Sequence, residues 1–321
     1  MDDYLRHICT SSGAFLRREA IAIGYDDRRI AKLVRQHTWH RIRHGAYTFE
    51  DTWQPLNQEQ RHLLTAAAVL RAARAPVALS HTSALLQHGM PAWGIPLEDV
   101  HLTRLDQKSG RRQAGVAQHR GALLADDLTI VQGVSVTSPT RTALDLTTIA
   151  DVQHSLVAVD ALLKAKLTTQ EDLRRRNEAM RCWPNTLSTD LVIRLSDGRA
   201  ESVGESRTRY LLWRGGIPAP QSQFEIFGAF GQLVATVDFA WPGHGLFLEF
   251  DGRVKYTSLL KSGELVTDVV LREKRREELI CELTGWRCIR LIWADLERPE
   301  ATLARIRRAL GSPATLLRPT G

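Results

Sequence analysis

Apolar residues in the first fifty positions recur first at helical and then at strand spacing. A helical pattern over 16–23 ends at a glycine, and Asp26 is placed to cap a second helix over 27–36. Residues 39–47 then alternate as a short strand with a glycine turn. Two helices followed by a basic ribbon are the parts of a winged helix-turn-helix, whose second helix enters the DNA major groove. The pattern predicts such a domain over residues 1–55.

Cationic side chains surround the apolar stripe of the second helix and continue into the ribbon. Such cations neutralise phosphates, so the pattern predicts DNA binding. The alternative is an ordinary charged helix whose polar face is solvated. The candidate DNA-binding residues of this domain are Arg28, Arg29, Lys32, Arg35, Arg41 and Arg43.

Helical and strand patterns mix over residues 57–176, which predicts an α/β scaffold region. We expect a helix over 58–73, a hairpin or a bent strand over 131–136, and a helix capped by Ser138 with Pro139 at its first position. The region contains no nucleophile constellation and no phosphate-binding glycine loop. Its scattered histidines are each expected to pack in the core or lie on the surface rather than bind a metal; they are His81, His101 and His119.

The last third of the chain has the most regular pattern. Residues 177–200 are expected to form a linker, and a domain follows over 201–311. Apolar runs separated by glycine and proline predict the order α-β-β-β-α-β. These elements are a helix over 202–214, strands over 223–227, 232–239 and 246–251, a long helix ending near 283 and a strand over 286–293, with a further helix from 299. The chain is therefore expected to be a multidomain α/β (α+β) protein.

Three carboxylates stand near the ends of the second and third of these strands. Alternation along a strand places Glu249 and Asp251 on one face, and Asp238 lies beside them if the two strands pair. Acids on one face repel each other unless a cation or a shifted pKa relieves the repulsion. The cluster predicts a site for Mg²⁺ or Mn²⁺ formed by Asp238, Glu249 and Asp251. The alternative is that each acid is a solvated position of a half-exposed sheet.

The order of these elements and acids resembles the PD-(D/E)XK nuclease fold. More narrowly, residues 201–297 resemble the family of uncharacterised proteins related to very-short-patch-repair endonucleases. The resemblance implies metal-dependent hydrolysis of DNA phosphodiesters, with Asp238 and Glu249 as metal ligands and Glu205 as the acid of the first helix. It rests on the segments Glu201–Arg207, Val237–Pro242, Glu249–Gly252, Arg272–Arg276 and Leu283–Arg287.

At one position the chain departs from the nuclease pattern. The fold's lysine, which orients or activates the attacking water, stands two residues after the glutamate, and this chain has Asp251 there. Lys255 or Lys274 is then the candidate source of the missing positive charge, and Asp251 assists at the metal. The catalytic residues that the resemblance implies are Glu205, Asp238, Glu249, Asp251 and Lys255.

Two assignments in this domain have a structural alternative. Ser202 and Glu205 also fit a capping box, in which the glutamate reaches back to the start of the helix. On the long helix, Arg272 and Arg276 are candidates for contacts to DNA phosphates. The glutamates interleaved with them can instead pair with these arginines at helical spacing.

A second resemblance concerns the first half of the chain. Residues 13–49 resemble the N-terminal winged helix of AbiEi-type antitoxins, which are DNA-binding autorepressors of toxin–antitoxin operons. Segments 79–105 and 129–172 resemble the middle region of such bacterial proteins. The resemblance implies DNA as a partner, together with a cognate toxin or another protein.

Composition and charge narrow the class of protein further. The formal net charge of +7 favours a polyanionic partner, and the cations are mostly arginine, which suits phosphate and guanine recognition. The four cysteines form no CxxC pair and no zinc spacing. The first residues are acidic, and no apolar run approaches the length of a membrane span. These features predict a cytoplasmic protein with no membrane partner.

Together these observations leave functions of different classes. The favoured expectation is a DNA-binding protein with a Mg²⁺-dependent DNA endonuclease domain. The alternative is an AbiEi-like antitoxin and transcriptional autorepressor whose C-terminal domain keeps the nuclease fold without cleavage. A third possibility is that the same domain only binds a partner protein.

Overall fold

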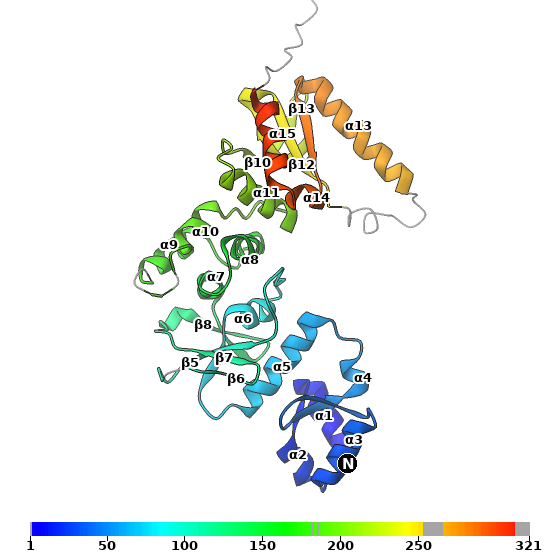
Figure 1. Cartoon of the computed structure of the whole chain (residues 1–321), viewed down its shortest axis with the longest axis vertical. Helices are drawn as coiled ribbons and strands as arrows, with labels where there is room; N and C mark the ends of the chain where they lie inside the picture. Colours follow the sequence, from blue (N-terminus) through cyan, green and yellow to red (C-terminus); the bar gives the residue numbers. More distant parts are fainter. Residues whose placement is uncertain (1, 109, 181–182, 185, 253–265, 312–321) are drawn as a thin grey trace, which may run out of the picture. The chain divides into compact units, whose positions relative to one another are not determined.

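The computed structural model describes residues 2–108, 110–180, 183–184, 186–252 and 266–311, with the backbone alone described over 266–273. The chain divides into two compact units (Figure 1). The first contains residues 1–162 and 166–193, and the second contains residues 163–165 and 194–321. Both combine helices with sheets, so the expected mixed α/β class is confirmed. The finer division into four segments stays a prediction.

The first unit begins with three helices and a small antiparallel sheet. These elements are α1 (Asp2–Ser12), β1 (Phe15–Leu16), α2 (Arg17–Ala22), α3 (Asp27–Arg35), β2 (Trp39–Arg43) and β3 (Ala46–Phe49). The sheet order is β1-β3-β2. Asp26 caps α3 as predicted, because its carboxylate accepts a 2.7 Å hydrogen bond from the amide of Arg29. Gly45 forms the turn between β2 and β3 with φ of +74°, a conformation that favours glycine.

An aromatic cluster forms the core of this part. Phe15, Trp39 and Phe49 are buried, and the rings of Phe15 and Trp39 meet edge to face with centroids 4.7 Å apart. Ile30 from the apolar stripe of α3 packs into the same cluster. Since the stripe is turned inward, the cationic positions of α3 are left on the outside.

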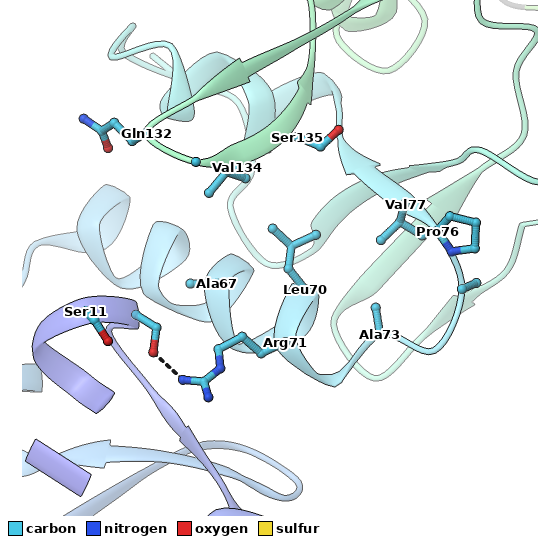
Figure 2. A pocket seen from close by; sticks show the side chains of 13 residues that line it. Ser11, Ala67, Leu70, Arg71, Ala73, Pro76, Val77, Gln132, Val134 and Ser135 are labelled. Atoms are coloured by element: carbon cyan, nitrogen blue, oxygen red, sulfur yellow. Dashed lines mark hydrogen bonds between the residues drawn. The ribbon is translucent and has the colours of Figure 1, made fainter. Parts of the chain in front are cut away.

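Arg71, near the end of α5 (Gln58–Ala72), connects this helix to the elements before it. Its guanidinium donates to the Ser12 hydroxyl, the Ala14 carbonyl and the Glu19 carboxylate. Figure 2 shows the side chain reaching from α5 to the end of α1. The contact borders a cavity of about 570 Å³, which is also lined by the turn at residues 132–135. The N-terminal elements and α5 are thus held together within one unit.

A six-stranded mixed sheet and several helices form the rest of the first unit. Its strands are β4 (Val77–Leu79), β5 (Val100–Arg104), β6 (Arg112–Gln113), β7 (Val116–His119), β8 (Leu128–Val131) and β9 (Val134–Thr137), in the order β6-β7-β5-β4-β9-β8. The other elements along this stretch are α4 (Glu50–Trp53), α6 (His81–Gln87), a 3-10 turn (Ala125–Asp127), α7 (Pro139–Leu146), α8 (Val152–Lys164), α9 (Gln170–Glu178) and α10 (Thr189–Leu195). The predicted hairpin is confirmed by pairing of Val131 with Val134, and Ser138 caps α7 as predicted.

The second unit follows the predicted order α-β-β-β-α-β. Its elements are α11 (Val203–Arg214), β10 (Gln221–Phe227), β11 (Leu233–Trp241), a 3-10 turn (Pro242–His244), β12 (Leu246–Phe250), α13 (Val266–Thr284), β13 (Arg287–Leu291), α14 (Trp293–Leu296) and α15 (Pro299–Gly311). The sheet order is β10-β11-β12-β13. β11 runs antiparallel to both β10 and β12, whereas β13 runs parallel to β12.

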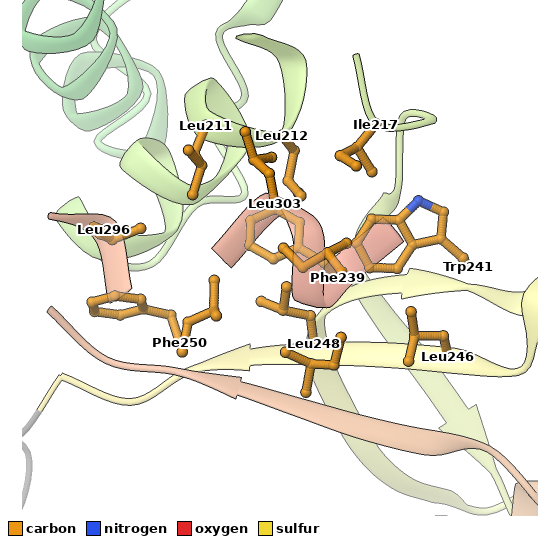
Figure 3. Close-up of a cluster of buried hydrophobic side chains, with 13 residues drawn as sticks. Leu211, Leu212, Ile217, Phe239, Trp241, Leu246, Leu248, Phe250, Leu296 and Leu303 are labelled. Atoms are coloured by element: carbon orange, nitrogen blue, oxygen red, sulfur yellow. The ribbon is translucent and has the colours of Figure 1, made fainter. Parts of the chain in front are cut away.

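One face of this sheet packs on α11 and α15. Figure 3 shows Leu212 and Leu303 from these helices above Phe239, Leu248 and Phe250 of the strands. Leu248 and Phe250 therefore face the core, as the alternation predicts. The opposite face carries the acidic positions and packs against α13 through Ile280, Val237 and Phe247.

Candidate functional site

Asp238 and Glu249 come from neighbouring strands of the second unit. The β11–β12 pairing ends at Phe239 opposite Leu248, and continuing this register would place Asp238 opposite Glu249. Instead, Oδ2 of Asp238 accepts a 2.7 Å hydrogen bond from the amide of Phe250. Asp238 and Glu249 thus lie at the same end of two paired strands, but among the described residues the three predicted ligands are not gathered into one metal-binding group.

Glu249 is only 8% exposed, and both of its carboxylate oxygens have a cationic partner. Nη1 of Arg276, on α13, donates to Oε1 at 2.8 Å, and Nη2 of Arg290, on β13, lies 3.4 Å from Oε2. Nη2 of Arg276 also donates to the Thr236 carbonyl at 2.5 Å. The repulsion expected among the acids is thus relieved by two guanidinium groups.

Arg290 is the residue of this site that the sequence analysis missed. Its guanidinium contacts three carboxylates, with nitrogen–oxygen distances of 2.6 Å to Glu277, 3.4 Å to Glu249 and 3.6 Å to Asp251. Burial alone would lower the pKa of Arg290, but the hydrogen bond that Arg290 donates to Glu277 and the charges of Glu277 and Glu249 raise that pKa above its ordinary value. Parallel pairing of Glu249 with Arg290 creates this contact, and only knowledge of the strand order would have revealed it.

Glu205 lies at the start of α11, and its hydrogen bonds are those of a residue that stabilises a helix end. Its Oε1 accepts a hydrogen bond from the Ser202 hydroxyl at 2.7 Å. Its Oε2 accepts from the Glu201 amide at 2.8 Å and from the Gln223 side-chain amide at 3.0 Å. The side chain is 2% exposed and both oxygens are engaged, so Glu205 helps to hold the start of α11. Its backbone partner is the Glu201 amide rather than the N-cap amide that a capping box uses.

The other residues predicted for this site do not form one cluster in the structure. Asp251 extends the β12–β13 pairing, its amide donating to the Leu291 carbonyl at 2.7 Å. Lys274 is exposed and lies 3.9 Å from Glu278, one turn further along α13. Lys255 and the side chain of Arg272 lie outside the described residues.

The donor set fits a divalent cation only in part. Glu249, Asp251 and Glu277 lie around the guanidinium of Arg290, and Glu249 also pairs with Arg276. Both oxygens of Glu249 are already paired, so an ion at this carboxylate would compete with Arg276 and Arg290.

Helix α3 presents cations of a different kind. Arg28, Lys32 and Arg35 recur at helical spacing, which places them on one face, and Arg29 lies beside them with its guanidinium 4.5 Å from the Tyr25 ring centroid. All four are exposed, and none forms an ion pair with a carboxylate in the part of the chain that the structure describes. The acid of the same helix, Asp27, pairs with Arg17 at 2.6 Å. This face can therefore bind a polyanion without first breaking an ion pair.

The two predicted arginines of the ribbon differ in their exposure. Arg41 is exposed, and its Nη2 lies 3.4 Å from Nδ1 of His44. Arg43 is half-buried beside a cavity that Glu59 also lines, and burial lowers the pKa of its guanidinium. Arg41 is thus the better placed of the two to meet a phosphate.

Comparisons with known proteins show which family the middle of the chain resembles. Residues 62–192 match the family model of the AbiEi antitoxin C-terminal domain. Two uncharacterised proteins of Mycobacterium tuberculosis, from strains CDC 1551/Oshkosh and H37Rv, are each 28% identical over 181 residues. The match covers 56% of this chain and 63% of each relative, so the chain spans less than two thirds of their length. The resemblance of the middle region to antitoxin proteins is confirmed, whereas those of residues 13–49 and 201–297 stay predictions.

Among the described residues, no helix combines the length and apolar character needed to cross a membrane. Within the same residues, Cys9, Cys281 and Cys288 are free thiols. Burial raises the pKa of each of the three, so these cysteines are poor nucleophiles at neutral pH.

Proposed function

We propose that this chain is a DNA-binding regulator of the antitoxin type, which represses its own operon through a winged helix formed by α1–α3 and the β2–β3 ribbon. One observation carries the proposal: α3 exposes four cations that no described carboxylate neutralises. The antitoxin family match over residues 62–192, directly after this segment, supports the regulatory class.

Recognition of DNA follows from the placement of these cations. The second helix of a helix-turn-helix lies in the major groove, where arginine binds guanine edges or phosphates. The face with Arg28, Lys32 and Arg35 is the outward face of that helix, because Ile30 packs into the core on the other side. Arg41 on the ribbon would then meet the sugar–phosphate backbone.

The second unit supports a regulator more than an enzyme. Glu249 is held by Arg276 and Arg290, and Asp251 stands where the nuclease fold has its lysine. A domain of this kind keeps the fold and offers its surface to a partner. By analogy with the antitoxin family, we propose a cognate toxin as that partner.

Binding of the full chain to the DNA upstream of its own reading frame tests this function. Fluorescence anisotropy with a labelled duplex is compared for the wild type and for Arg28→Ala with Arg29→Ala. Two contacts at roughly 1–3 kcal/mol each predict a loss of about 30-fold or more. Arg174→Ala with Arg175→Ala removes the same charge from the exposed face of α9 and should change the affinity less than about threefold. Equal losses in both double variants, or equal affinity for a scrambled duplex, would contradict the proposal.

The second candidate function is a Mg²⁺- or Mn²⁺-dependent DNA endonuclease. The gathering of three carboxylates within 3.6 Å of the Arg290 guanidinium favours it. Asp238, Glu249 and Asp251 would hold the ion, which when bound would supply charge stabilisation at the phosphate. Arg276, freed from Glu249, would be available to a phosphate oxygen.

Incubation of the full chain with supercoiled plasmid and Mg²⁺ or Mn²⁺ distinguishes the two functions. Endonuclease activity should disappear in Asp238→Ala and persist in Glu300→Ala, a variant of an exposed acid on α15. Asp251→Lys restores the residue usual for the fold and should keep or raise the activity. Nicking of equal strength in wild type and Asp238→Ala indicates contamination, and no nicking in any variant leaves the regulator as the function.

A further inference from the structure

Three histidines that are far apart in the sequence meet in the first unit. His81 is the first residue of α6, His101 lies on β5 and His119 ends β7. Nδ1 of His101 and Nε2 of His119 are 2.9 Å apart, and the rings of His81 and His119 stack with centroids 3.8 Å apart. One nitrogen from each ring can be chosen so that all three lie within 4.8 Å of one another. The expectation of separate packed or surface histidines is therefore wrong about their arrangement.

The parallel pairing of β5 with β7 explains this meeting. His101 pairs with Ala117 and Thr103 with His119, so the two histidines stand two residues apart along adjacent strands. Ser80 immediately precedes α6, and its hydroxyl lies 2.9 Å from Nδ1 of His81. This contact orients the ring and leaves Nε2 as the nitrogen of His81 that can face the other two. An oriented imidazole with one engaged nitrogen is typical of metal-binding histidines.

A cavity of about 570 Å³ adjoins two of the three rings. His81 and His119 line it, together with Thr103 and Asp145. The Thr103 hydroxyl and Oδ2 of Asp145 are buried and have no hydrogen-bond partner among the described residues, although Arg141 binds Oδ1 at 2.7 Å. Buried polar atoms without a partner are rare in folded proteins, and a bound ion with its water molecules is one way to satisfy them.

We propose that His81, His101 and His119 bind one divalent transition-metal ion, with Zn²⁺ the best match to the donor set. Three neutral imidazoles are a ligand set of zinc, whereas Mg²⁺ and Ca²⁺ prefer oxygen donors. Tetrahedral coordination at about 2.0–2.1 Å places ligand nitrogens roughly 3.4 Å apart. The three rings are stacked in this structure, so they must rotate to direct their lone pairs at one ion. The adjoining cavity leaves room for a water molecule as a fourth ligand.

The ion would add a cross-link between three elements that already meet through the β5–β7 strand pairing and the hydrogen bond from the Ser80 amide to the His101 carbonyl. It would join the start of α6 to β5 and β7 inside the region that matches the antitoxin domain. A ligand that binds only the folded state stabilises it by RT ln(1 + [L]/Kd), so the site would hold this unit together. This role is independent of whether the chain binds DNA.

A second cluster in the chain, formed by Glu249, Glu277 and Cys288, is the competing candidate for a metal ion. Its carboxylates are already paired with Arg276 and Arg290, and burial raises the pKa of the Cys288 thiol, which disfavours the thiolate that zinc needs. The two clusters differ in their chemistry, since only the second contains sulfur. An experiment can therefore separate them by spectroscopy as well as by mutation.

The test uses the full chain without a histidine tag, stripped with EDTA and titrated with Co²⁺ and then Zn²⁺. We expect one equivalent of Co²⁺ with visible bands of tetrahedral coordination and no thiolate charge-transfer band, and displacement of Co²⁺ by Zn²⁺. His101→Gln with His119→Gln should abolish binding. His154→Gln, outside the cluster on α8, and Cys288→Ser should each bind as the wild type does.

Several results would overturn the proposal. For the wild-type protein, these results are binding of less than half an equivalent at micromolar Co²⁺ or a sulfur charge-transfer band in the spectrum. For the variants, they are loss of binding in Cys288→Ser or full binding in the double histidine variant. If the double variant fails to fold, His119→Gln alone and the wild-type spectrum still decide between the two clusters. A Zn²⁺-dependent rise in the melting temperature of wild type and His154→Gln, absent in His119→Gln, is the expected independent readout.

Discussion

Glu249 and Arg290 are register partners on the parallel strands β12 and β13, and Nη2 of the arginine lies 3.4 Å from Oε2 of the glutamate. The strand that completes the sheet thus supplies a cation to the acid at its centre. Arg276 from α13 reaches the other oxygen at 2.8 Å. The acidic cluster is consequently a network of ion pairs that includes a helix and two strands.

Glu249→Gln should therefore destabilise the second unit. The substitution leaves two partly buried guanidinium groups with a neutral partner, which costs about 2 kcal/mol. If repulsion among the acids dominated, Glu249→Gln would instead raise the stability of the unit. Thermal unfolding of the full chain without divalent ions measures the change. Glu278→Gln removes an exposed glutamate whose lysine partner is 3.9 Å away, and it should alter the stability by less than about 0.5 kcal/mol. A higher melting temperature for Glu249→Gln would show that the arginines do not neutralise the site.

DNA affinity should fall steeply as the salt concentration rises. Each phosphate contact releases condensed counterions, so Arg41→Ala should lower the slope of log affinity against log salt by about one unit. Affinities of the full chain for the upstream duplex at several NaCl concentrations give the slope. Arg174→Ala, on α9, should leave it unchanged. A slope that is the same in wild type and Arg41→Ala would remove the ribbon from the interface.

Gly204→Ala should weaken the packing of α11 on the sheet. A Cβ at this position would overlap the ring of Phe250, which is itself buried against Trp293, so helix and strand must move apart. Overpacking of this kind costs roughly 1–3 kcal/mol. Gly243→Ala is the matched control, because a Cβ there meets nothing within 4 Å and the backbone φ is not positive. The two variants are compared by urea unfolding, and equal stability would refute the close approach of α11 to β12.

Acid should destabilise the first unit through its buried histidines, of which His88 is the simplest to study. Burial lowers the pKa of His88 below its ordinary value, although the hydrogen bond from Nε2 to the Thr137 carbonyl at 2.8 Å partly offsets this. Because the pKa of His88 is lower in the folded state than in the unfolded state, its contribution to the free energy of unfolding is complete above the pKa of the unfolded state, about 6.5. That contribution is lost as the pH falls through the pKa of the folded state. The effect of one such group is at most about 1.4 kcal/mol per pH unit.

His88→Gln removes this titration while keeping an amide that can donate to the Thr137 carbonyl. The melting temperature in the presence of EDTA should therefore fall less steeply below pH 6.5 in the variant than in the wild type. Titration of the His88 ring protons by NMR gives its pKa directly. A value at or above 6.5 would contradict the burial of this side chain.

Local signals in the sequence predicted much of the fold. Asp26 and Ser138 cap helices where their spacing indicated, because a cap depends only on the next three residues. The order of elements in the second unit was likewise predictable from apolar runs and glycine breaks. The first helix, α1, was missed because its buried residues are only Leu5 and Cys9 among mostly polar positions.

The contacts that the sequence analysis missed depend on how strands pair. Arg290 lies 41 residues from Glu249 and meets it because β13 adds in parallel beside β12. His101 and His119 meet for the same reason, through the parallel pairing of β5 with β7. Parallel strands are joined by long connections, so no local pattern records their register. Glu205 had two interpretations from sequence, and only its hydrogen bonds showed that both oxygens are used at the start of α11.

Arg71 sets a practical limit on how the DNA-binding part can be isolated. A fragment ending at residue 55 would lose the guanidinium that neutralises Glu19, and would uncover Leu16 where Leu64 and Ala68 now lie against it. Newly bared apolar surface promotes self-association, so such a fragment should aggregate or bind DNA poorly for reasons unrelated to its basic helix. The shortest peptide suitable for NMR or crystallisation with DNA therefore extends through Ala72.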